Sequence, residues 1–154
     1  MLKYITGVKN QLPLYYFERL SEIPRGSGNE KEVANYIADF ARKKGLYCYT
    51  DEHLNVFVRR SASKGRENEA PILLQAHTDM VCEKNKGTVH DFAKDPIRLV
   101  QEGNILHADG TTLGADNGIG VAAAMAILAD KSVVHPPLEV LVTVDEETGM
   151  YGAF

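Results

Sequence analysis

The sequence has 154 residues, no tryptophan, only two cysteines and no strong excess of either charge. Cys48 and Cys82 form no CxxC pair, so neither a disulfide framework nor a CxxC metal site is expected. A net charge of -4 with scattered lysines and arginines argues against a nucleic-acid partner. No apolar run reaches the roughly 20 residues that cross a bilayer, so no membrane partner is expected. Residues 1–20 lack the continuous apolar core of a signal peptide, and we therefore expect a cytoplasmic location.

The chain does contain an alternation of helical and strand patterns. Apolar residues at helical spacing predict helices over about 14–23, 29–44 and 121–130, and Ser27 with Glu30 has the form of a capping box for the second. Short apolar runs predict strands at about 46–50, 55–60, 71–76, 97–100, 105–107 and 138–144. This alternation predicts a single α/β domain, which we expect to be a three-layer α/β/α sandwich with a mixed, mostly parallel sheet.

Three acidic residues follow the last predicted strand. The run 138–144 is apolar and rich in β-branched residues, which predicts a strand covered on both faces. Asp145, Glu146 and Glu147 come at its carboxyl end. Neighbouring carboxylates raise one another's pKa where solvent is scarce, so a divalent cation is one interpretation. An acidic turn that faces water is the other.

Two further predicted loops carry candidate ligands. His77 and Asp79 follow the strand at 71–76, and their side chains point the same way if strand geometry continues. Asp79 can then hold the second ring nitrogen of a metal-bound His77, although a core histidine with a local acceptor is an alternative. Asp116 precedes a glycine-rich helix start, where it is either a ligand or an ordinary helix cap. Ligands collect beyond the carboxyl ends of strands, so we expect these groups along one edge of the sheet.

One imidazole and several carboxylates on one edge suit zinc or manganese. A shared carboxylate can bridge two such ions about 3.5–4 Å apart. The chemistry also requires a base that is not a ligand, and Glu146 and Glu147 can divide these roles because neighbours on a strand point apart. The glycines at 114, 118 and 120 form GxxxGxG, which is neither a dinucleotide fingerprint nor a P-loop, so nucleotide binding is not expected.

Three motifs in this order resemble those of the M20 metallopeptidases, and within them the aminoacyl-histidine (Xaa-His) dipeptidase branch. They are AHTDMV at 76–81, LGADNGIG at 113–120 and DEETG at 145–149. IPRGSGNE at 23–30 and the continuation of the first motif to Asn85 are similar to the same branch. The resemblance implies a metallo-dipeptidase that hydrolyses small peptides, preferentially Xaa-His dipeptides, and a homodimeric parent enzyme.

The resemblance also implies a role for each site residue. His77 would bind the first zinc, Asp79 would orient His77, and Asp116 would bridge both ions. Glu146 would be the general base and Glu147 a ligand of the second zinc. The implied cofactor is a pair of divalent ions, zinc first, with cobalt or manganese as alternatives. A cis peptide bond is implied between Asp116 and Asn117.

The match has two departures from the family pattern. Members of the family are longer and supply further ligands and a lid or dimerisation domain downstream. We therefore expect residues 1–154 to be the N-terminal part of the catalytic domain, with weak zinc binding and little hydrolysis on their own. Leu54 stands where the family often has glycine in a D-x-x-G-N turn, so either the turn avoids positive φ or Leu54 is strained.

Two other functions remain open at this point. The zinc core alone does not choose the acyl group, so another M20 amidase or deacylase acting on N-acyl amino acids is an alternative. A metal-binding or dimerisation module without catalysis is the non-enzymatic alternative.

Overall fold

The computed structural model describes residues 2–3, 5–7 and 11–154. Its elements, in chain order, are α1 (Leu12–Ser21), α2 (Lys31–Lys43), β1 (Tyr47–Thr50), β2 (Val56–Arg60), β3 (Ile72–His77), β4 (Leu99–Glu102), β5 (Ile105–Ala108), α3 (Ala115–Ala129), β6 (Leu138–Thr143) and a final 3-10 turn (Tyr151–Ala153). Each predicted helix and strand is present. The largest shift is in α3, which begins at Ala115, inside the segment expected to be a loop.

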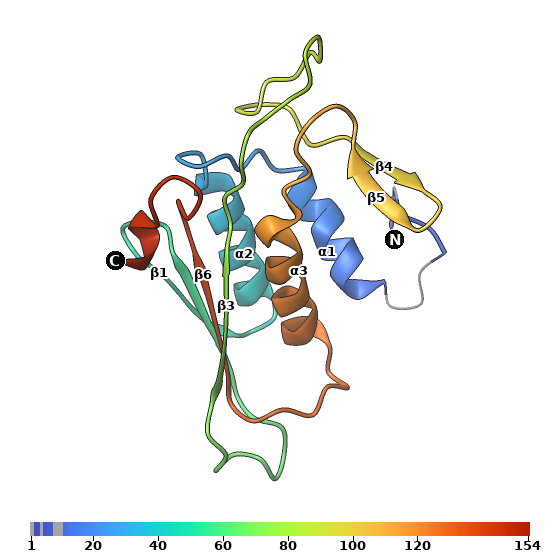
Figure 1. Cartoon of the computed structure of the whole chain (residues 1–154). Helices are drawn as coiled ribbons and strands as arrows, with labels where there is room; N and C mark the ends of the chain where they lie inside the picture. The colour runs from blue at the N-terminus through green and yellow to red at the C-terminus, as the bar shows by residue number, and fades with distance from the viewer. Residues whose placement is uncertain (1, 4, 8–10) are drawn as a thin grey trace.

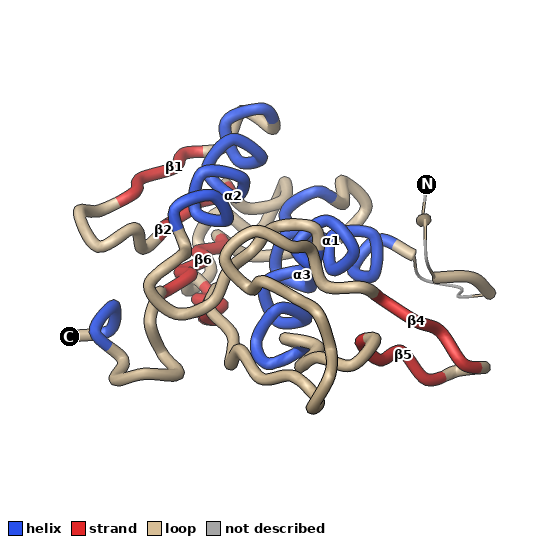
Figure 2. The backbone as a smooth tube through the Cα atoms, turned by 90° about the horizontal axis from the view of Figure 1, so that it is seen from above, coloured by secondary structure: helices blue, strands red, loops and turns tan. Residues whose placement is uncertain are grey.

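Four strands form the main sheet in the order β1-β2-β6-β3. β6 pairs with β3 in parallel and with β2 antiparallel, and β1 pairs with β2 antiparallel. The three helices lie on the same side of this sheet, and β4 and β5 form a separate hairpin near the N-terminus (Figures 1 and 2). The α/β class with a mixed sheet is confirmed. Within the described residues, however, antiparallel pairing predominates and the helices form one layer.

The core lies between the sheet and the helices. Val56, Val58, Val140 and Val142 are buried on the helix side of β2 and β6, opposite a strongly amphipathic α2. Burying one such side chain stabilises the fold by about 1.5–3 kcal/mol. α3 is apolar nearly all round, as expected for a helix packed between α1 and the sheet (Figure 1). This packing fixes where the first turn of α3, with Asp116, meets the ends of the strands.

The opposite face of the sheet is open. Tyr47, Tyr49 and Leu73 are 60%, 58% and 53% exposed. In β6 the buried residues alternate with partly exposed ones, and Glu139 pairs with Arg59 at 3.0 Å on this open side. The prediction that this strand is covered on both faces is therefore wrong for the described chain.

The turn between β1 and β2 shows which of the two alternatives for Leu54 holds, a turn without positive φ or a strained residue. Leu54 has φ +76°, in the left-handed region, while its side chain packs partly buried against the core. A left-handed non-glycine residue costs about 1–2 kcal/mol, so the alternative of a strained Leu54 is the one observed.

No helix within the described ranges has the length and apolar character needed to cross a bilayer.

Candidate metal centre

Two adjacent parallel strands bring the first candidate ligands to one edge of the sheet. β3 and β6 are in register to their last residues, with His77 opposite Thr143. The segments 77–79 and 145–147 therefore leave the sheet side by side, as the carboxyl ends of parallel strands must. The start of α3 adds Asp116 from a third segment.

The side chains of His77, Asp116 and Glu147 converge, and we call them the outer cluster. One ligand atom from each lies within 4.8 Å of the others. His77 Nε2 is 3.2 Å from Asp116 Oδ1 and 3.8 Å from Glu146 Oε2. His77 is buried, whereas the Asp116 side chain is 88% exposed. The structure thus brings together all of the ligand candidates that the sequence indicated, with Glu146 beside them.

The outer cluster fits a divalent cation by its donor chemistry. An imidazole nitrogen and two carboxylates are ligands that zinc and related ions accept. Among the described residues, no main-chain N–H donates to the carboxylates of Asp116 or Glu147. Partial burial raises the pKa of Glu147, and the nearby charges of Glu146, Asp116 and Asp79 add to this against the opposing effect of His77. In the part of the chain that the structure describes, His77 is the group that offsets the charge of these carboxylates, and a bound cation would add to it.

Asp116 is not an ordinary helix cap. The cap position of α3 is Gly114, in the left-handed conformation, and no side-chain cap hydrogen bond is present there. Asp116 itself has non-helical dihedrals of φ -84° and ψ 113°. The peptide bond between Asp116 and Asn117 is cis, which confirms the expectation from the resemblance.

Asp79 lies behind the outer cluster and has no exposed surface. His77 Nδ1 is 3.2 Å from Asp79 Oδ1. The main-chain N–H of Glu146 donates to Oδ1 and that of Glu147 to Oδ2, both at 3.0 Å, while the Ser27 hydroxyl donates to Oδ2 at 2.7 Å. Burial by itself raises the pKa of Asp79, but the hydrogen bonds and His77 outweigh it and hold that pKa below its ordinary value. Asp79 therefore contacts His77 and also fixes the turn that carries both glutamates.

Two local predictions about these segments are wrong. Ser27 and Glu30 form no capping box, because α2 starts without a side-chain cap bond and the Ser27 hydroxyl reaches Asp79 instead. Glu146 and Glu147 do not continue β6; they lie in a turn entered through Asp145, which has φ +57°. Their side chains therefore do not alternate as on a strand, and both approach His77.

A second group of acids, Glu30, Asp79 and Asp145, also has its oxygens within 4.8 Å of one another, and we call it the inner cluster. Glu30 Oε1 accepts the main-chain N–H of Asp145 at 3.1 Å, and Thr148 donates its hydroxyl to Asp145. The pKa of Glu30 is raised, first by burial and also by Asp79, against hydrogen bonds from main-chain amides. Groups of the protein thus donate hydrogen bonds to the carboxylates of the inner cluster.

Arg25, Ser27 and Glu30 were not recognised as site residues from the sequence. All three belong to the run IPRGSGNE, whose similarity to the dipeptidase branch was the available signal. This similarity did not indicate what each of the three residues does, because each one contacts a partner that is far away in the sequence.

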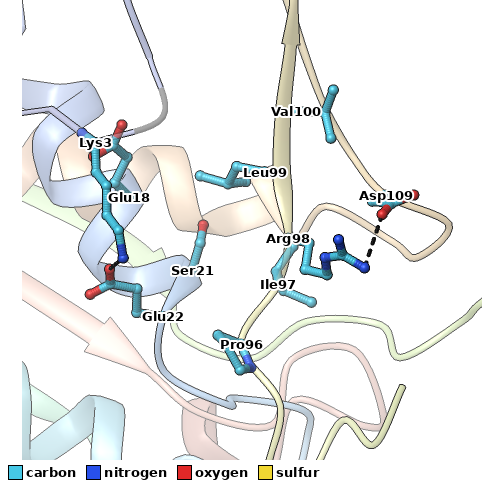
Figure 3. A pocket seen from close by; sticks show the side chains of 10 residues that line it. All are labelled: Lys3, Glu18, Ser21, Glu22, Pro96, Ile97, Arg98, Leu99, Val100 and Asp109. Atoms are coloured by element: carbon cyan, nitrogen blue, oxygen red, sulfur yellow. Dashed lines mark hydrogen bonds and ion pairs between the residues drawn. The ribbon is translucent and has the colours of Figure 1, made fainter. Parts of the chain in front are cut away.

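Two cavities in the described part of the chain are not lined by the outer cluster. One of about 500 Å³ lies between α1 and the segment leading into β4 (Figure 3). Its charged side chains pair with one another, Lys3 with Glu22 at 3.8 Å and Arg98 with Asp109 at 3.2 Å. Another of about 470 Å³ borders Glu146 on the open side of the sheet. The convergence of donor atoms, and not cavity volume, identifies the site.

An α/β fold with an imidazole and carboxylates gathered at the carboxyl ends of adjoining strands has the architecture of a metal-dependent hydrolase. Residues 73–154 match the model of Peptidase family M20/M25/M40. The chain belongs to this family. All three motifs that carry the outer cluster fall within the matched segment.

Three similar proteins are described as peptidases. The chain is 52% identical to the cytosol non-specific dipeptidase of Escherichia coli K12 over 138 residues, which is 90% of this chain and 28% of that protein. It is 48% identical to the aminoacylhistidine dipeptidase of Vibrio alginolyticus, with a TM-score of 0.89 over 92% of this chain and 29% of that one. The YXEP protein of Bacillus subtilis, described as a dinuclear metal-binding peptidase of the M20 family, shares the fold with a TM-score of 0.53 and 18% identity, over 88% of this chain and 35% of that one. The chain thus spans less than a third of the length of the two dipeptidases.

Proposed function

We propose that this chain supplies part of the dinuclear zinc centre of a cytoplasmic dipeptidase whose preferred substrates are Xaa-His dipeptides. The observation that carries the proposal is the outer cluster with Glu146 beside it, 3.8 Å from His77. His77 and Asp116 are assigned to the first ion, and Asp116 and Glu147 to the second. Cobalt and manganese accept the same donors, so zinc is the first choice among three.

The residues of this chain divide the work of peptide hydrolysis. When bound, the two ions would polarise the peptide carbonyl and acidify a water. Glu146 takes the proton of the attacking water and hands it to the leaving amine nitrogen, so the same carboxylate serves as base and then acid. Asp79 holds the ring of His77 and, through two main-chain amides, the position of Glu146 itself. This fixed arrangement supports Glu146 as the group that moves the proton.

The substrate class rests on the relatives. Both closely similar proteins carry the name dipeptidase, and one of them is named for aminoacyl-histidine substrates. The family alone admits other amides, so N-acyl amino acid hydrolysis is the alternative within enzymes. The resemblance also supports a homodimeric whole protein as part of the same proposal.

The test is the variant Glu146→Gln in the whole protein in which these residues occur. We expect bound zinc to be retained and turnover of Xaa-His dipeptides to fall by about 10²–10⁴-fold, because a glutamine cannot accept the proton. Glu32→Gln, an exposed change on α2, is the matched control and should leave turnover unchanged. Substantial turnover by Glu146→Gln would refute the assignment of the base.

A substrate panel separates the remaining functions. Faster hydrolysis of Xaa-His dipeptides than of N-acyl amino acids supports the dipeptidase. The reverse order supports the amidase or deacylase. Zinc binding with no hydrolysis of either substrate class by the whole protein supports the non-catalytic module.

A further inference from the structure

Arg25 is a buried cation that binds main-chain carbonyls. It lies in the loop between α1 and α2 and is 2% exposed. Nη1 donates to the carbonyl of Thr78 at 2.8 Å, with a longer contact of 3.5 Å to the carbonyl of Asp79. Nη2 donates to the carbonyl of Gly114 at 2.5 Å. One guanidinium thus joins the segment that follows β3 to the segment that begins α3.

The glycine pattern of the α3 motif makes room for this guanidinium. A Cβ placed on Gly114 would lie 2.6 Å from Arg25 Nη2 and 2.6 Å from Met80 Sδ. A Cβ on Gly118 would also lie 2.6 Å from Arg25 Nη2. Such distances exclude a side chain at both positions while Arg25 stays in place. Two of the glycines in GxxxGxG therefore accommodate an arginine of this same chain.

The loop that carries Arg25 is itself anchored beside the first motif. Gly26 forms a parallel bridge with Met80. A Cβ on Gly26 would lie 2.5 Å from Cys82 Sγ, so a side chain at this position would displace the Cys82 thiol. Two residues on, Ser27 donates to Asp79. The run from Arg25 to Ser27 is therefore held against the His77 segment by its main chain as well as by its side chains.

We propose that Arg25 is a positioning residue that sets the separation of His77 from Asp116 and thereby the affinity of the outer cluster for metal. The inference rests on the ligand set of the proposed function. His77 directly precedes one accepting carbonyl, that of Thr78, and Asp116 lies two residues after the other, that of Gly114. A planar fork with two donor nitrogens spans both carbonyls at once. The single ammonium of a lysine cannot reproduce this bridge.

Two other roles for Arg25 predict different results. Burial lowers the pKa of Arg25 to about 10, against the opposing charges of Asp79 and Cys82, so the guanidinium remains charged at neutral pH. If Arg25 acts only through this charge, a neutral replacement should strengthen metal binding, because a buried cation repels a second one. If Arg25 acts only on folding, replacements should lower stability and leave metal binding by the folded chain unchanged.

The experiment is a zinc titration by calorimetry of the whole protein in which these residues occur, in the wild type, Arg25→Lys and Arg25→Met. Circular dichroism and urea unfolding establish the folded fraction of each. Positioning predicts that both variants lose about tenfold or more in zinc affinity, the range known for residues that orient metal ligands. Arg60→Met is the matched control. Arg60 also donates to two carbonyls, those of Ile127 and Asp130, but it lies at the end of β2 that is away from the outer cluster. It should leave zinc affinity unchanged.

The outcomes separate the inference from the proposed function. Unchanged or tighter zinc binding in folded Arg25→Met overturns the positioning role while the ligand set stands. If Arg25→Met does not fold, Arg25→Lys decides, since it keeps the charge and loses only the bridge. If neither variant folds, Arg25 is a folding residue and the inference is wrong. A wild-type whole protein that binds no zinc contradicts the ligand set, and the inference falls with it.

Discussion

The outer and inner clusters contain similar groups at similar distances but differ in what surrounds them. In each, the donor atoms lie within 4.8 Å of one another. In the inner cluster, Glu30 and Asp79 are buried and accept hydrogen bonds from main-chain amides and from the Ser27 hydroxyl. In the outer cluster, Asp116 is exposed and no main-chain N–H of the described chain donates to it or to Glu147.

This difference is the reason why we propose the outer cluster, and not the inner cluster, as the metal site. Carboxylates whose lone pairs are filled by protein donors are already compensated, and a cation gains little there. Carboxylates that face an imidazole without such donors remain available as ligands. The inner cluster therefore holds the turn, and the outer cluster is the one that we propose as the metal site.

The largest expected effect comes from breaking the inner cluster at Asp79. Each carboxylate oxygen of Asp79 has two hydrogen-bond contacts, and Asp79→Asn replaces one of these oxygens by an amide that donates, leaving buried donors unpaired. We expect a loss of about 3 kcal/mol in the free energy of unfolding, measured by urea denaturation. Asp116→Asn, at an exposed carboxylate without such donors, should stay within about 0.5 kcal/mol of the wild type. Equal losses in the two variants would remove the distinction between the clusters.

The next effect concerns metal binding. Here we expect a change in the outer cluster to have a larger effect than a change in the inner cluster, the reverse of the order expected for stability. Asp116→Ala removes the proposed bridging ligand, and we expect zinc affinity to fall by at least a hundredfold, equivalent to about 2.7 kcal/mol. Glu30→Gln, in the inner cluster, should retain zinc binding. Elemental analysis after dialysis and a calorimetric titration both report this. Loss of zinc in Glu30→Gln with retention in Asp116→Ala would move the site to the inner cluster.

A smaller effect is expected at Ser27, which supplies one donor to the inner cluster. Ser27→Ala should lower the free energy of unfolding by about 1 kcal/mol, because the partner is a buried carboxylate. Ser132→Ala is the matched control, since Ser132 makes the same hydroxyl-to-carboxylate bond to Asp130 at 2.7 Å on the exposed surface. The free energy of unfolding of Ser132→Ala should be close to that of the wild type. Comparable losses would mean that burial does not strengthen the Ser27 contact.

The smallest effect is a change in how stability depends on pH. The pKa of Asp79 is lowered in the folded chain, so its contribution is present above its unfolded pKa of about 3.9 and is lost as pH falls through the folded value. The pKa of Glu30 is raised, so its contribution is present below its unfolded pKa of about 4.3 and is lost as pH rises through the folded value.

Variants at these two residues should therefore change the pH profile in opposite directions. Asp79→Asn should make the decline of stability below about pH 4 shallower. Glu30→Gln should reduce the decline that Glu30 causes as pH rises above about 4.3. Urea denaturation at a series of pH values measures both slopes. A change of the same sign in both variants would contradict the opposite pKa shifts.

Prediction from the sequence succeeded where the pattern is local. Helical and strand periodicity located every α-helix and β-strand of the described chain, because the burial of one face repeats along the segment itself. The convergence of His77, Asp116 and Glu147 was also predicted, since they lie at strand ends or at the start of a helix, and such ends share an edge of the sheet. The roles of these residues in metal binding and catalysis stay predictions.

Prediction failed in the loop from Arg25 to Glu30. Ser27 and Glu30 fit a capping box three residues apart, yet the partner of Ser27 is 52 residues away and that of Glu30 is 115 residues away. Arg25 reaches a carbonyl 89 residues along the chain. A buried polar group takes whichever partner the surrounding packing offers, and local spacing does not record that choice.

The sequence by itself determined the class of fold, the family and the candidate ligands, because apolar periodicity and ordered motifs are properties of short segments. Only the tertiary structure decided that Asp79 holds the turn of Glu146 and Glu147, that Arg25 fills the space left by two glycines, and that one acidic cluster is compensated while the other is not. These features arise from contacts between segments that packing brings together. Hydrogen bonding and electrostatic compensation of a buried group depend on all of its neighbours in space.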